Sequence, residues 1–493
     1  MTNMPEITMG LVGVSRDCFP VELTKKRLAK VVEECRKLNL NVVPCSTVIE
    51  SETDAMAAVD EMAEAGVDAC AVYLGNFGPE GPTTIFAETL NVPFMLCAAA
   101  EESGKDLING RGDAFCGMLS ASLNTKLRDL TPHIPAKPVG LPEHTAQNIA
   151  HFIDVARVVV ALNSLKVFSF GPRPQDFYAC NAPIKPLYDL GLEVMENSEL
   201  DMFLLYKDAA NKASEIDAIV SDMQKELGEG NTRPDKLRQL AQFEVALTGF
   251  LEENLGSREY AVYANKCWPA FESAFGFVPC YVNSRLAARG IPAACEVDMY
   301  GAVSEYIVQC AGQYPVTILD VNNTVPDDIE IADLKGATRD DLFMGFHCGN
   351  TATCLLCGTP CMKYQLIMNR LMEDPNSEPD ITAGTLEGTL CPGPTTVFRL
   401  QPDLEFEGVM AYLAEGHILD ADPASFGSIG IFGIPNFARF YRHTLLERGF
   451  PHHAAIGFRH VARIVYDAMA LLGVPDLSTP RPPNDLYPTE NPF

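Results

Sequence analysis

Residues 7–15, Ile-Thr-Met-Gly-Leu-Val-Gly-Val-Ser, form a short apolar run that predicts a buried strand. In residues 21–38, which follow, apolar side chains recur at helical spacing between Lys, Arg and Glu. The alternation continues with strands expected at 41–45, 69–74 and 93–97, and with helices at 51–65, capped by Ser51, at 83–90 and around 149–162. Strands that alternate with helices predict a parallel, doubly wound sheet.

A second α/β domain is expected to follow, and after it the pattern changes from alternating helices and strands to short β-rich runs. Its predicted strands are 166–170, 202–205, 260–264 and 293–296, and its predicted helices are 183–190, 209–227, 234–255 and 301–311. After about residue 312, short β-rich runs at 315–320, 342–346 and 395–401 are separated by Gly, Pro and Asp, and one helix is expected over about 453–472. The predicted fold is therefore two doubly wound parallel-sheet α/β domains, residues 1–163 and 164–312, followed by an antiparallel β-rich C-terminal domain over 313–493.

Composition excludes several classes of partner. A chain of 493 residues is too long for one hydrophobic core, which agrees with several domains. The formal net charge of −28 repels phosphate backbones and anionic membrane surfaces, which argues against nucleic-acid and membrane partners. No apolar run reaches the roughly 18 residues that a membrane span needs. The first nine residues lack the pattern of a signal peptide, so a cytoplasmic location is expected.

Sixteen cysteines are a high count, and in a cytoplasmic chain they are expected to be reduced thiols rather than disulfides. One dense group, Cys348, Cys354, Cys357 and Cys361, has the Cys-x-x-Cys spacing that invites a zinc or iron–sulfur interpretation. A zinc ribbon, however, has two cysteine pairs separated by a longer loop. We therefore expect packed thiols or a redox-sensitive patch.

Three acidic residues stand at the ends of apolar strands. Glu296 and Asp298 lie in Ala-Cys-Glu-Val-Asp, where a predicted strand leads into a helix, and Asp320 lies in Leu-Asp-Val-Asn. Acids at the carboxyl end of a strand lie where α/β sheets bind ligands. Asp298 is better explained as the cap of the helix that it precedes, an explanation that fits Glu296 poorly. Asp320 alone is weak support for a site, because Asp followed by Asn is common in turns.

Four of the nine histidines lie between His443 and His460. In the predicted helix that begins near His453, that residue and His460 are seven residues apart and would share one face. Taken alone, the segment is best explained by capping or packed imidazoles. Together with Glu296 and Asp320, however, His453 would complete an O/O/N ligand set with open positions, which suits Mn²⁺ or Mg²⁺.

These segments resemble the metal site of the L-fucose/L-arabinose isomerase superfamily. The 24-residue separation of Glu296 and Asp320, their strand contexts, and the late segment from His453 to Leu-Leu-Gly-Val-Pro are similar to the family's ligand segments. Residues 384–400 and 432–441 resemble the C-terminal domain of short fucose-isomerase-like proteins. The resemblance covers most of the chain and is weakest over residues 100–260.

The resemblance implies a metal-dependent aldose–ketose isomerase that acts on a free sugar through an enediol. Glu296, Asp320 and His453 would hold Mn²⁺, or another divalent metal such as Mg²⁺ or Co²⁺, and the two acids would share the proton transfers. A homo-hexamer with sites at subunit interfaces is also implied. The further substrate-binding candidates are Arg16, supplied by a neighbouring subunit, Phe77, Lys266, Trp268, His347 and His452.

Other functions stay open at this point. The substrate could be L-arabinose, D-arabinose or an anionic hexose such as a sulfonated sugar, for which Arg16, Lys266 and Arg459 are the basic residues that hint at a pocket. A non-catalytic sugar-binding protein would also have tandem α/β domains, but it would lack a metal site. A cysteine-cluster redox protein is the third alternative, and metal analysis and an absorbance spectrum would test it.

Overall fold

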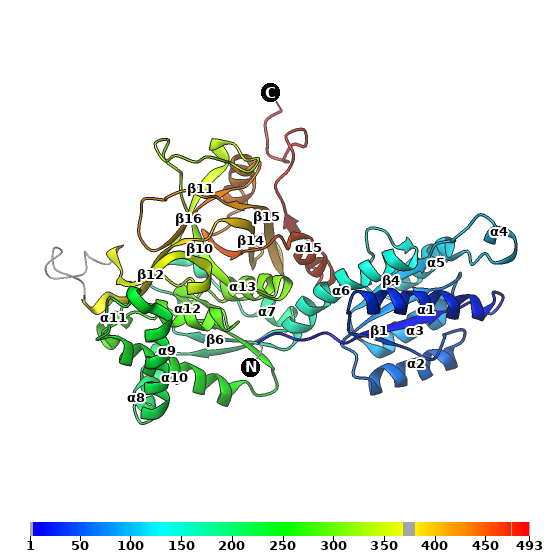
Figure 1. The fold of residues 1–493 in the computed structure, drawn as a ribbon, viewed down its shortest axis with the longest axis horizontal. Helices are drawn as coiled ribbons and strands as arrows, with labels where there is room; N and C mark the ends of the chain where they lie inside the picture. The colour runs from blue at the N-terminus through cyan, green and yellow to red at the C-terminus, as the bar shows by residue number, and fades with distance from the viewer. Residues whose placement is uncertain (1–2, 368–379, 475, 493) are drawn as a thin grey trace. The chain divides into compact units, whose positions relative to one another are not determined.

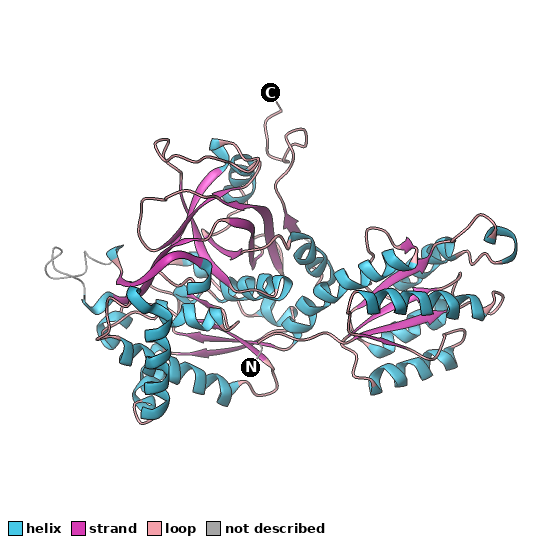
Figure 2. Ribbon diagram, in the orientation of Figure 1, coloured by secondary structure: helices cyan, strands magenta, loops and turns pink. Residues whose placement is uncertain are grey.

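The computed structural model describes residues 3–367, 380–474 and 476–492 and divides the chain into two compact units (Figure 1). The N-terminal unit comprises Pro5–Val160 together with Asp467–Gly473, and the main unit contains the other described residues. Helices and strands alternate in the N-terminal unit, whereas the later part of the main unit is rich in strands (Figure 2). No helix among the described residues is both long enough and apolar enough to cross a membrane.

The N-terminal unit is built on one parallel sheet with the strand order β2-β1-β3-β4-β5. All six residues of β1 are buried, as expected for a strand inside a sheet that is covered on both faces. The predicted alternation is confirmed, and Ser51 caps its helix by accepting a hydrogen bond from the backbone N–H of Asp54. The strands are β1 (Met9–Val14), β2 (Val42–Pro44), β3 (Ala69–Leu74), β4 (Phe94–Ala99) and β5 (Val139–Gly140). The helices are α1 (Val21–Lys37), α2 (Glu52–Glu64), α3 (Glu80–Leu90), α4 (Asp106–Asn109), α5 (Ala114–Leu127) and α6 (Pro142–Asn163).

The main unit begins with a second parallel sheet, in the order β7-β6-β8-β9. The predicted strand at 202–205 is wrong, because Ser198 and Asp201 form a capping box that starts helix α8 there. The strands are β6 (Leu165–Phe170), β7 (Glu193–Asn197), β8 (Tyr260–Ala264) and β9 (Ala293–Ala294). The helices are α7 (Lys185–Asp189), α8 (Glu199–Ala209), α9 (Ala213–Leu227), α10 (Leu237–Asn254), α11 (Phe271–Phe275), α12 (Cys280–Ala288) and α13 (Met299–Gly312).

The third sheet is mixed and mostly antiparallel, in the order β12-β13-β16-β11-β10-β17-β14-β15-β18. A further pairing of β15 with β16 closes six of the described strands into an antiparallel ring. The predicted fold class, two parallel α/β sheets followed by a β-rich C-terminal region, is confirmed. The strands are β10 (Val316–Asn323), β11 (Leu342–His347), β12 (Leu356–Tyr364), β13 (Ala383–Leu390), β14 (Gly393–Pro402), β15 (Val409–Ile418), β16 (Ser428–Gly433), β17 (His453–Gly457) and β18 (Asp476–Ser478).

The predicted helix at 453–472 is only partly correct. Its first residues form strand β17, which pairs with β10 on one side and β14 on the other, and helix α15 (Ala462–Leu471) begins nine residues after His453. All five residues of β17 are buried. A short apolar run that is buried on both faces has no period to distinguish a strand from a helix, and the two neighbouring strands decide the outcome.

Helix α13 joins the two sheets of the main unit. Every one of its residues is buried, and it contacts β6 and β8 of the parallel sheet as well as β10, β14 and β17 of the mixed sheet. One short turn, Cys295–Val297, separates the end of β9 from the start of α13, so the carboxyl end of the parallel sheet lies beside the strands of the mixed sheet that α13 contacts. Glu296, Asp320 and His453 all lie at this junction.

Candidate active site at the junction of two sheets

Two antiparallel strands bring Asp320 and His453 together. Strand β10 pairs with β17, and Asp320 lies directly opposite His453 in the register. Side chains in directly opposed positions share a face of the sheet, with Cβ atoms about 4.5–5.5 Å apart. The imidazole of His453 is fully buried, and the Asp320 side chain is 21% exposed. Two candidates from distant parts of the sequence are therefore cross-strand neighbours.

Glu296 reaches the same place through a strained turn. Strand β9 ends at Ala294, two residues before its predicted end, and Cys295–Val297 form a 3-10 turn. Glu296 and Val297 both have left-handed backbone conformations, each with φ of 59°. This conformation costs roughly 1–2 kcal/mol for a residue with a side chain, and such strain concentrates at functional sites. The turn leaves the Glu296 carboxylate facing His453.

The three predicted ligands converge on one ring nitrogen. His453 Nε2 lies 3.0 Å from Glu296 Oε2 and 3.5 Å from Asp320 Oδ1. The neighbouring His452 contributes Nε2 at 3.9 Å from Asp320 Oδ1. Each acid therefore lies within reach of the imidazole. Among the described residues, the ligand atoms of Asp320, His452 and His453 lie within 4.8 Å of one another, and so do those of Cys180, Glu296 and His453.

Asp298 fixes the orientation of His453 from the opposite side of the ring. Its Oδ2 lies 2.8 Å from His453 Nδ1, and because a carboxylate only accepts, Nδ1 donates and Nε2 faces the two other acids. The predicted helix-capping role of Asp298 is confirmed, since its Oδ1 also accepts from the backbone N–H of Gly301 at 2.8 Å. Arg399 donates two hydrogen bonds, of 2.5 and 3.0 Å, to the same carboxylate. Asp298 is thus a buried anchor as well as a cap.

The pKa values reflect a strong mutual field. Burial opposes ionisation of Glu296, but the facing His453 outweighs it and lowers the pKa of that carboxyl to about 2. Burial likewise disfavours the charged form of Asp298, yet Arg399 and His453 hold its pKa well below the usual range. The pKa of His453 is well above its usual value, because the acids around it outweigh the cost of burial. The low pKa of Glu296 and the high pKa of His453 agree with a positive charge held between these two groups.

The donor set fits a divalent cation. Among the described residues, Asp320 Oδ1 and His453 Nε2 are buried without a hydrogen-bond partner, although each has a ligand atom of another candidate within 3.5 Å. Two carboxylates and one imidazole match the ligands of Mn²⁺ or Mg²⁺ better than those of a thiolate-seeking metal. A histidine that binds a metal through one ring nitrogen commonly donates a hydrogen bond from the other nitrogen to a carboxylate, as His453 does to Asp298.

A cavity of about 270 Å³ opens onto these groups. Trp268 forms one side and donates from Nε1 to Glu296 Oε1 at 2.9 Å. Phe177 packs edge-on against the rings of Trp268 and His452, at centroid distances of 5.9 and 5.3 Å. The lining residues are Phe177, Cys267, Trp268, Cys295, Glu296, Asp320, Phe346, His347, Cys348, Gln365, Ile367 and His452. Such a volume and mixture of aromatic and polar groups suit a small polar substrate.

The cavity includes some of the other predicted substrate contacts and not others. Trp268, His347 and His452 line it, and the His347 ring lies 5.8 Å from that of His453. Burial and the neighbouring His453 lower the pKa of His452, so its ring is neutral near pH 7 and can donate or accept. Lys266 is not among the lining residues, because its Nζ pairs with Glu199 at 3.0 Å and donates to the carbonyl of Pro172.

Arg16 and Phe77 belong to the N-terminal unit, where they contact each other. The Arg16 guanidinium lies 5.1 Å from the centre of the Phe77 ring, and its Nε donates to the carbonyl of Gly78. Both residues follow strands of the parallel sheet, β1 and β3, so they lie at the carboxyl edge where α/β sheets bind ligands. Their predicted roles in substrate binding stay predictions.

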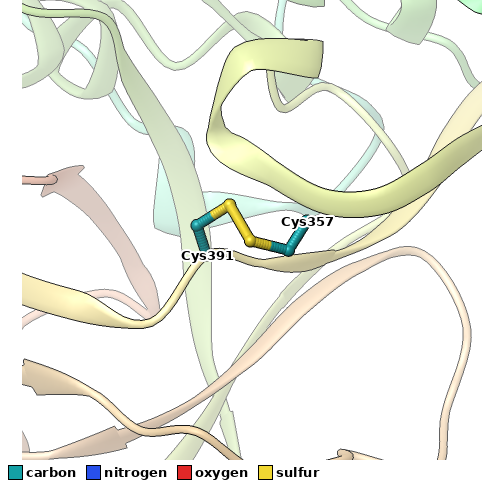
Figure 3. Close-up of a disulfide and its surroundings, with 2 residues drawn as sticks. All are labelled: Cys357 and Cys391. Atoms are coloured by element: carbon teal, nitrogen blue, oxygen red, sulfur yellow. A yellow bond between two sulfur atoms is a disulfide. The ribbon is translucent and has the colours of Figure 1, made fainter.

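Two predictions about sulfur and histidine chemistry need correction. His460 does not share a helix face with His453, since it lies beyond β17 and its Nε2 lies 2.8 Å from the carbonyl of Gly416. The cysteines at 348–361 do not pack together: Cys354 is exposed, and Cys357 forms a disulfide with Cys391 (Figure 3). This pairing follows from the antiparallel contact of β12 with β13, after which Cys391 comes next in the chain. The remaining described cysteines are free thiols, as expected.

Several site residues escaped the sequence-based prediction. Phe177, Gln365 and Cys295 line the cavity, and nothing in their local sequence marks them. Arg399 had a detectable signal, since a charged residue between Phe398 and Leu400 interrupts an apolar strand, and the structure buries it to 2% exposure. A charge buried to this degree requires a partner, and Asp298 is that partner.

One buried acid beside the site has a consequence for stability. Burial, and next the charge of Asp298, raise the pKa of Glu305 on α13 to about 8. The folded chain therefore keeps this proton at pH values where an unfolded chain, with an ordinary Glu pKa of about 4.3, has lost it. The stability of the main unit should thus fall as pH rises from about 4.5 to 8.

A Glu305→Gln variant removes this linkage. We expect its stability relative to the parent to grow between pH 5 and pH 8 by on the order of 3 kcal/mol, measured by urea denaturation at several pH values. Glu253→Gln, on the exposed surface of α10, is the matched control for the loss of a carboxyl group. A Glu305→Gln difference that does not change with pH would show that Glu305 is ionised in the folded chain.

The sequence matches two family models. Residues 10–163 match "Fucose/sulfoquinovose isomerase, N-terminal domain", and residues 345–478 match "L-fucose isomerase, C-terminal domain". The second match contains His453, whereas Glu296 and Asp320 lie in the segment between the two.

Curated relatives point the same way. A protein of Priestia aryabhattai named sulfoquinovose isomerase is 22% identical over 96% of this chain and 99% of its own length. Proteins with the same name from Alkalicoccus urumqiensis and Clostridium sp. (strain MSTE9) are 24% and 30% identical, over 68% and 38% of this chain and 70% and 42% of their own lengths.

Proposed function

This chain belongs to the fucose isomerase family of aldose–ketose isomerases, and from that premise we propose that it isomerises a sulfonated hexose with the help of a divalent metal. The observation that carries the metal-dependent part is the convergence of Glu296 and Asp320 on His453 Nε2, within 3.0 and 3.5 Å. The relatives named sulfoquinovose isomerase favour a sulfonated sugar over L-fucose or L-arabinose as the substrate.

The residues of the site have separate roles in the proposed isomerisation, namely metal binding and proton transfer. Glu296, Asp320 and His453 would hold the cation, which when bound supplies Lewis acidity toward charge on the sugar oxygens. Glu296, ionised at neutral pH, accepts a proton from the carbon beside the carbonyl and returns it to the neighbouring carbon. Asp320 shares this acid–base work across the site. The proton transfers convert aldose to ketose through an enediol.

The side chains that line the cavity orient Glu296 and are placed to contact the sugar. The hydrogen bond from Trp268 holds Glu296 Oε1, so the other carboxylate oxygen is the one that faces His453. The Phe177 ring and the Trp268 indole limit water access on this side of the cavity. A neutral His452 can exchange hydrogen bonds with sugar hydroxyl groups.

The sulfonate requires a positive group that the described cavity lining does not contain. None of the described lining residues is Lys or Arg. Lys266 is paired with Glu199, and Arg459 donates to the carbonyl of Gly312 and stacks over Tyr314. We therefore propose Arg16 of a neighbouring subunit as the sulfonate contact, since its side chain is 34% exposed and its ion pair with Glu80, at 3.7 Å, is longer than the 3.0 Å pair of Lys266 with Glu199.

A homo-oligomer, and a hexamer in particular, is part of the same proposal. Helix α5 carries Phe115, Leu119, Leu123 and Leu127 at four-residue intervals, which places them on one face. All four are more than 60% exposed, and an apolar stripe of this kind favours contact with another protein surface. The cytoplasmic location expected from the sequence stays a prediction.

A complementation experiment tests whether the sites lie at subunit interfaces. Arg16→Ala and Glu296→Gln chains with different tags are produced together and purified as mixed oligomers. If Arg16 acts across an interface, sites that combine an intact Arg16 with an intact Glu296 form, and the mixture regains isomerase activity that neither variant has alone. Light scattering gives the number of subunits. No regained activity would place both residues in a site within one chain.

A sugar panel tests the reaction and the substrate. The Mn²⁺-loaded protein is incubated with sulfoquinovose, D-glucose, L-fucose, L-arabinose and D-arabinose, and ketose formation is followed by NMR. We expect turnover of the sulfonated aldose with a kcat/KM at least 100-fold above that of D-glucose. Preferred turnover of a neutral sugar would refute the substrate assignment, and no turnover of any aldose would refute the proposed reaction.

A further inference from the structure

Four free cysteines from separate parts of the main unit gather beside the candidate active site. Cys267, Cys280 and Cys295 pack together in one buried cluster, each at most 3% exposed, and the partly buried Cys348 packs against them. They come from the loop after β8, the start of α12, the turn after β9 and the end of β11. The acid–base chemistry proposed above uses none of them.

Cys267 is the centre of this thiol cluster. Its thiol contacts the thiols of both Cys280 and Cys295. The side-chain amide of Gln365 donates to Cys267 Sγ at 3.3 Å and to Cys280 Sγ at 3.5 Å. Cys267 can therefore form a bond with either neighbour after a small movement.

The cavity gives small molecules access to some of these thiols. Cys267, Cys295 and Cys348 line the cavity, whereas Cys280 does not. Two of the lining thiols are sequence neighbours of site residues: Cys267 precedes Trp268, and Cys295 precedes Glu296. A change in the covalent state of either thiol therefore acts on the backbone of a site residue.

We propose that the thiol cluster is an oxidative modification site, in which a hydroperoxide that enters the cavity joins Cys267 to Cys295. The Cys267 sulfur attacks the peroxide, breaks the O–O bond and becomes a sulfenic acid, while one water or alcohol leaves. The Cys295 sulfur then attacks the sulfenic sulfur, the S–S bond forms and a second water leaves. The two thiols lose two electrons and two protons in total, and these reduce the hydroperoxide.

The disulfide would switch off the isomerase activity proposed above, on which this consequence depends. An S–S bond of about 2.05 Å requires the two sulfurs to approach well within their non-bonded distance. Movement of Cys295 also moves the backbone of the next residue, Glu296, which has a left-handed conformation with φ of 59°. The Glu296 carboxylate and its Trp268 partner then leave their positions against His453.

The test treats the Mn²⁺-loaded protein with hydrogen peroxide and reads two quantities. Peptide mapping under non-reducing conditions reports the linkage, and isomerase activity before and after dithiothreitol reports its effect. We expect a Cys267–Cys295 peptide and a loss of activity of at least tenfold that dithiothreitol reverses. The peptide readout does not depend on the sugar substrate, so failure of the proposed function leaves it interpretable.

Matched variants separate the partners, with each activity compared with that of the same variant before treatment. Cys280 also contacts Cys267 but does not line the cavity. Cys280→Ala should therefore still lose activity with hydrogen peroxide and regain it with dithiothreitol. Cys357→Ala removes the exposed disulfide and should also keep it. Cys295→Ala should abolish the linked peptide. Without this second thiol, Cys267 oxidises beyond the sulfenic acid, so dithiothreitol should reverse a smaller part of the loss. A Cys267–Cys280 linkage, no linkage, or an unchanged response in Cys295→Ala would overturn the proposal.

Discussion

Glu296→Gln should fold like the parent and lose turnover by about 10³-fold or more. The amide has nearly the same shape and can still accept the hydrogen bond from Trp268, so the local packing survives. It carries no charge, however, and can neither take the substrate proton nor balance a cation beside His453. The loss should appear in kcat, measured with saturating Mn²⁺ and with the sugar that the panel identifies.

A second buried acid provides the control for Glu296. Glu272 on α11 is 2% exposed and is not among the residues that line the cavity. Glu272→Gln should therefore keep kcat within a few-fold of the parent. If Glu296→Gln retained more than a tenth of the parent kcat while its fold was intact, Glu296 could not be the base.

Asp298→Asn should cost both stability and metal affinity. Arg399 is buried to 2% exposure and pairs with this carboxylate, and removing one partner of a buried ion pair costs roughly 3–5 kcal/mol. His453 Nδ1 also loses its charged acceptor, and an amide nitrogen facing it would favour the tautomer that places hydrogen on Nε2. Loss of a carboxylate behind a metal-binding histidine typically lowers affinity 10–100-fold.

A double variant separates the two consequences of Asp298→Asn. Adding Arg399→Met removes the unpaired buried charge, so part of the lost stability should return in denaturation measurements. The Mn²⁺ affinity should stay weak, because the orientation of His453 still lacks its charged acceptor. Recovery of affinity together with stability would show that Asp298 acts only by holding the fold together.

The sequence predicted the fold class because local patterns decide it. Helical spacing over residues 21–38 and the buried runs at β1, β3 and β4 are visible without any tertiary information. Predictions were wrong where neighbours decide the outcome. Residues 202–205 are apolar enough for a strand, but the Ser198 cap starts a helix, and β17 is a strand because β10 and β14 flank it.

The acidic part of the candidate site was predictable, because an acid that follows an apolar strand is visible in the sequence. Glu296 and Asp320 were identified in this way, His453 was identified from the histidines that gather between His443 and His460, and the family resemblance supported the combination of the three. The second role of Asp298 was not predictable, since its capping motif is local whereas Arg399 and His453 lie 101 and 155 residues away in the sequence. The cysteine cluster was missed for the same reason: it is assembled from four separate parts of the sequence, and Cys348 was grouped with its neighbours at 354–361 instead.

The most direct test of the central claim is a titration of the metal-free protein with Mn²⁺, followed by electron paramagnetic resonance and by isomerase activity on the same samples. If Glu296, Asp320 and His453 share one ion, the parent binds one Mn²⁺ per chain at this site and activity rises with its occupancy. Asp320→Asn and His453→Gln variants should lose that binding. Full turnover by the metal-free protein, or Mn²⁺ binding by both variants as tight as that of the parent, would contradict the account.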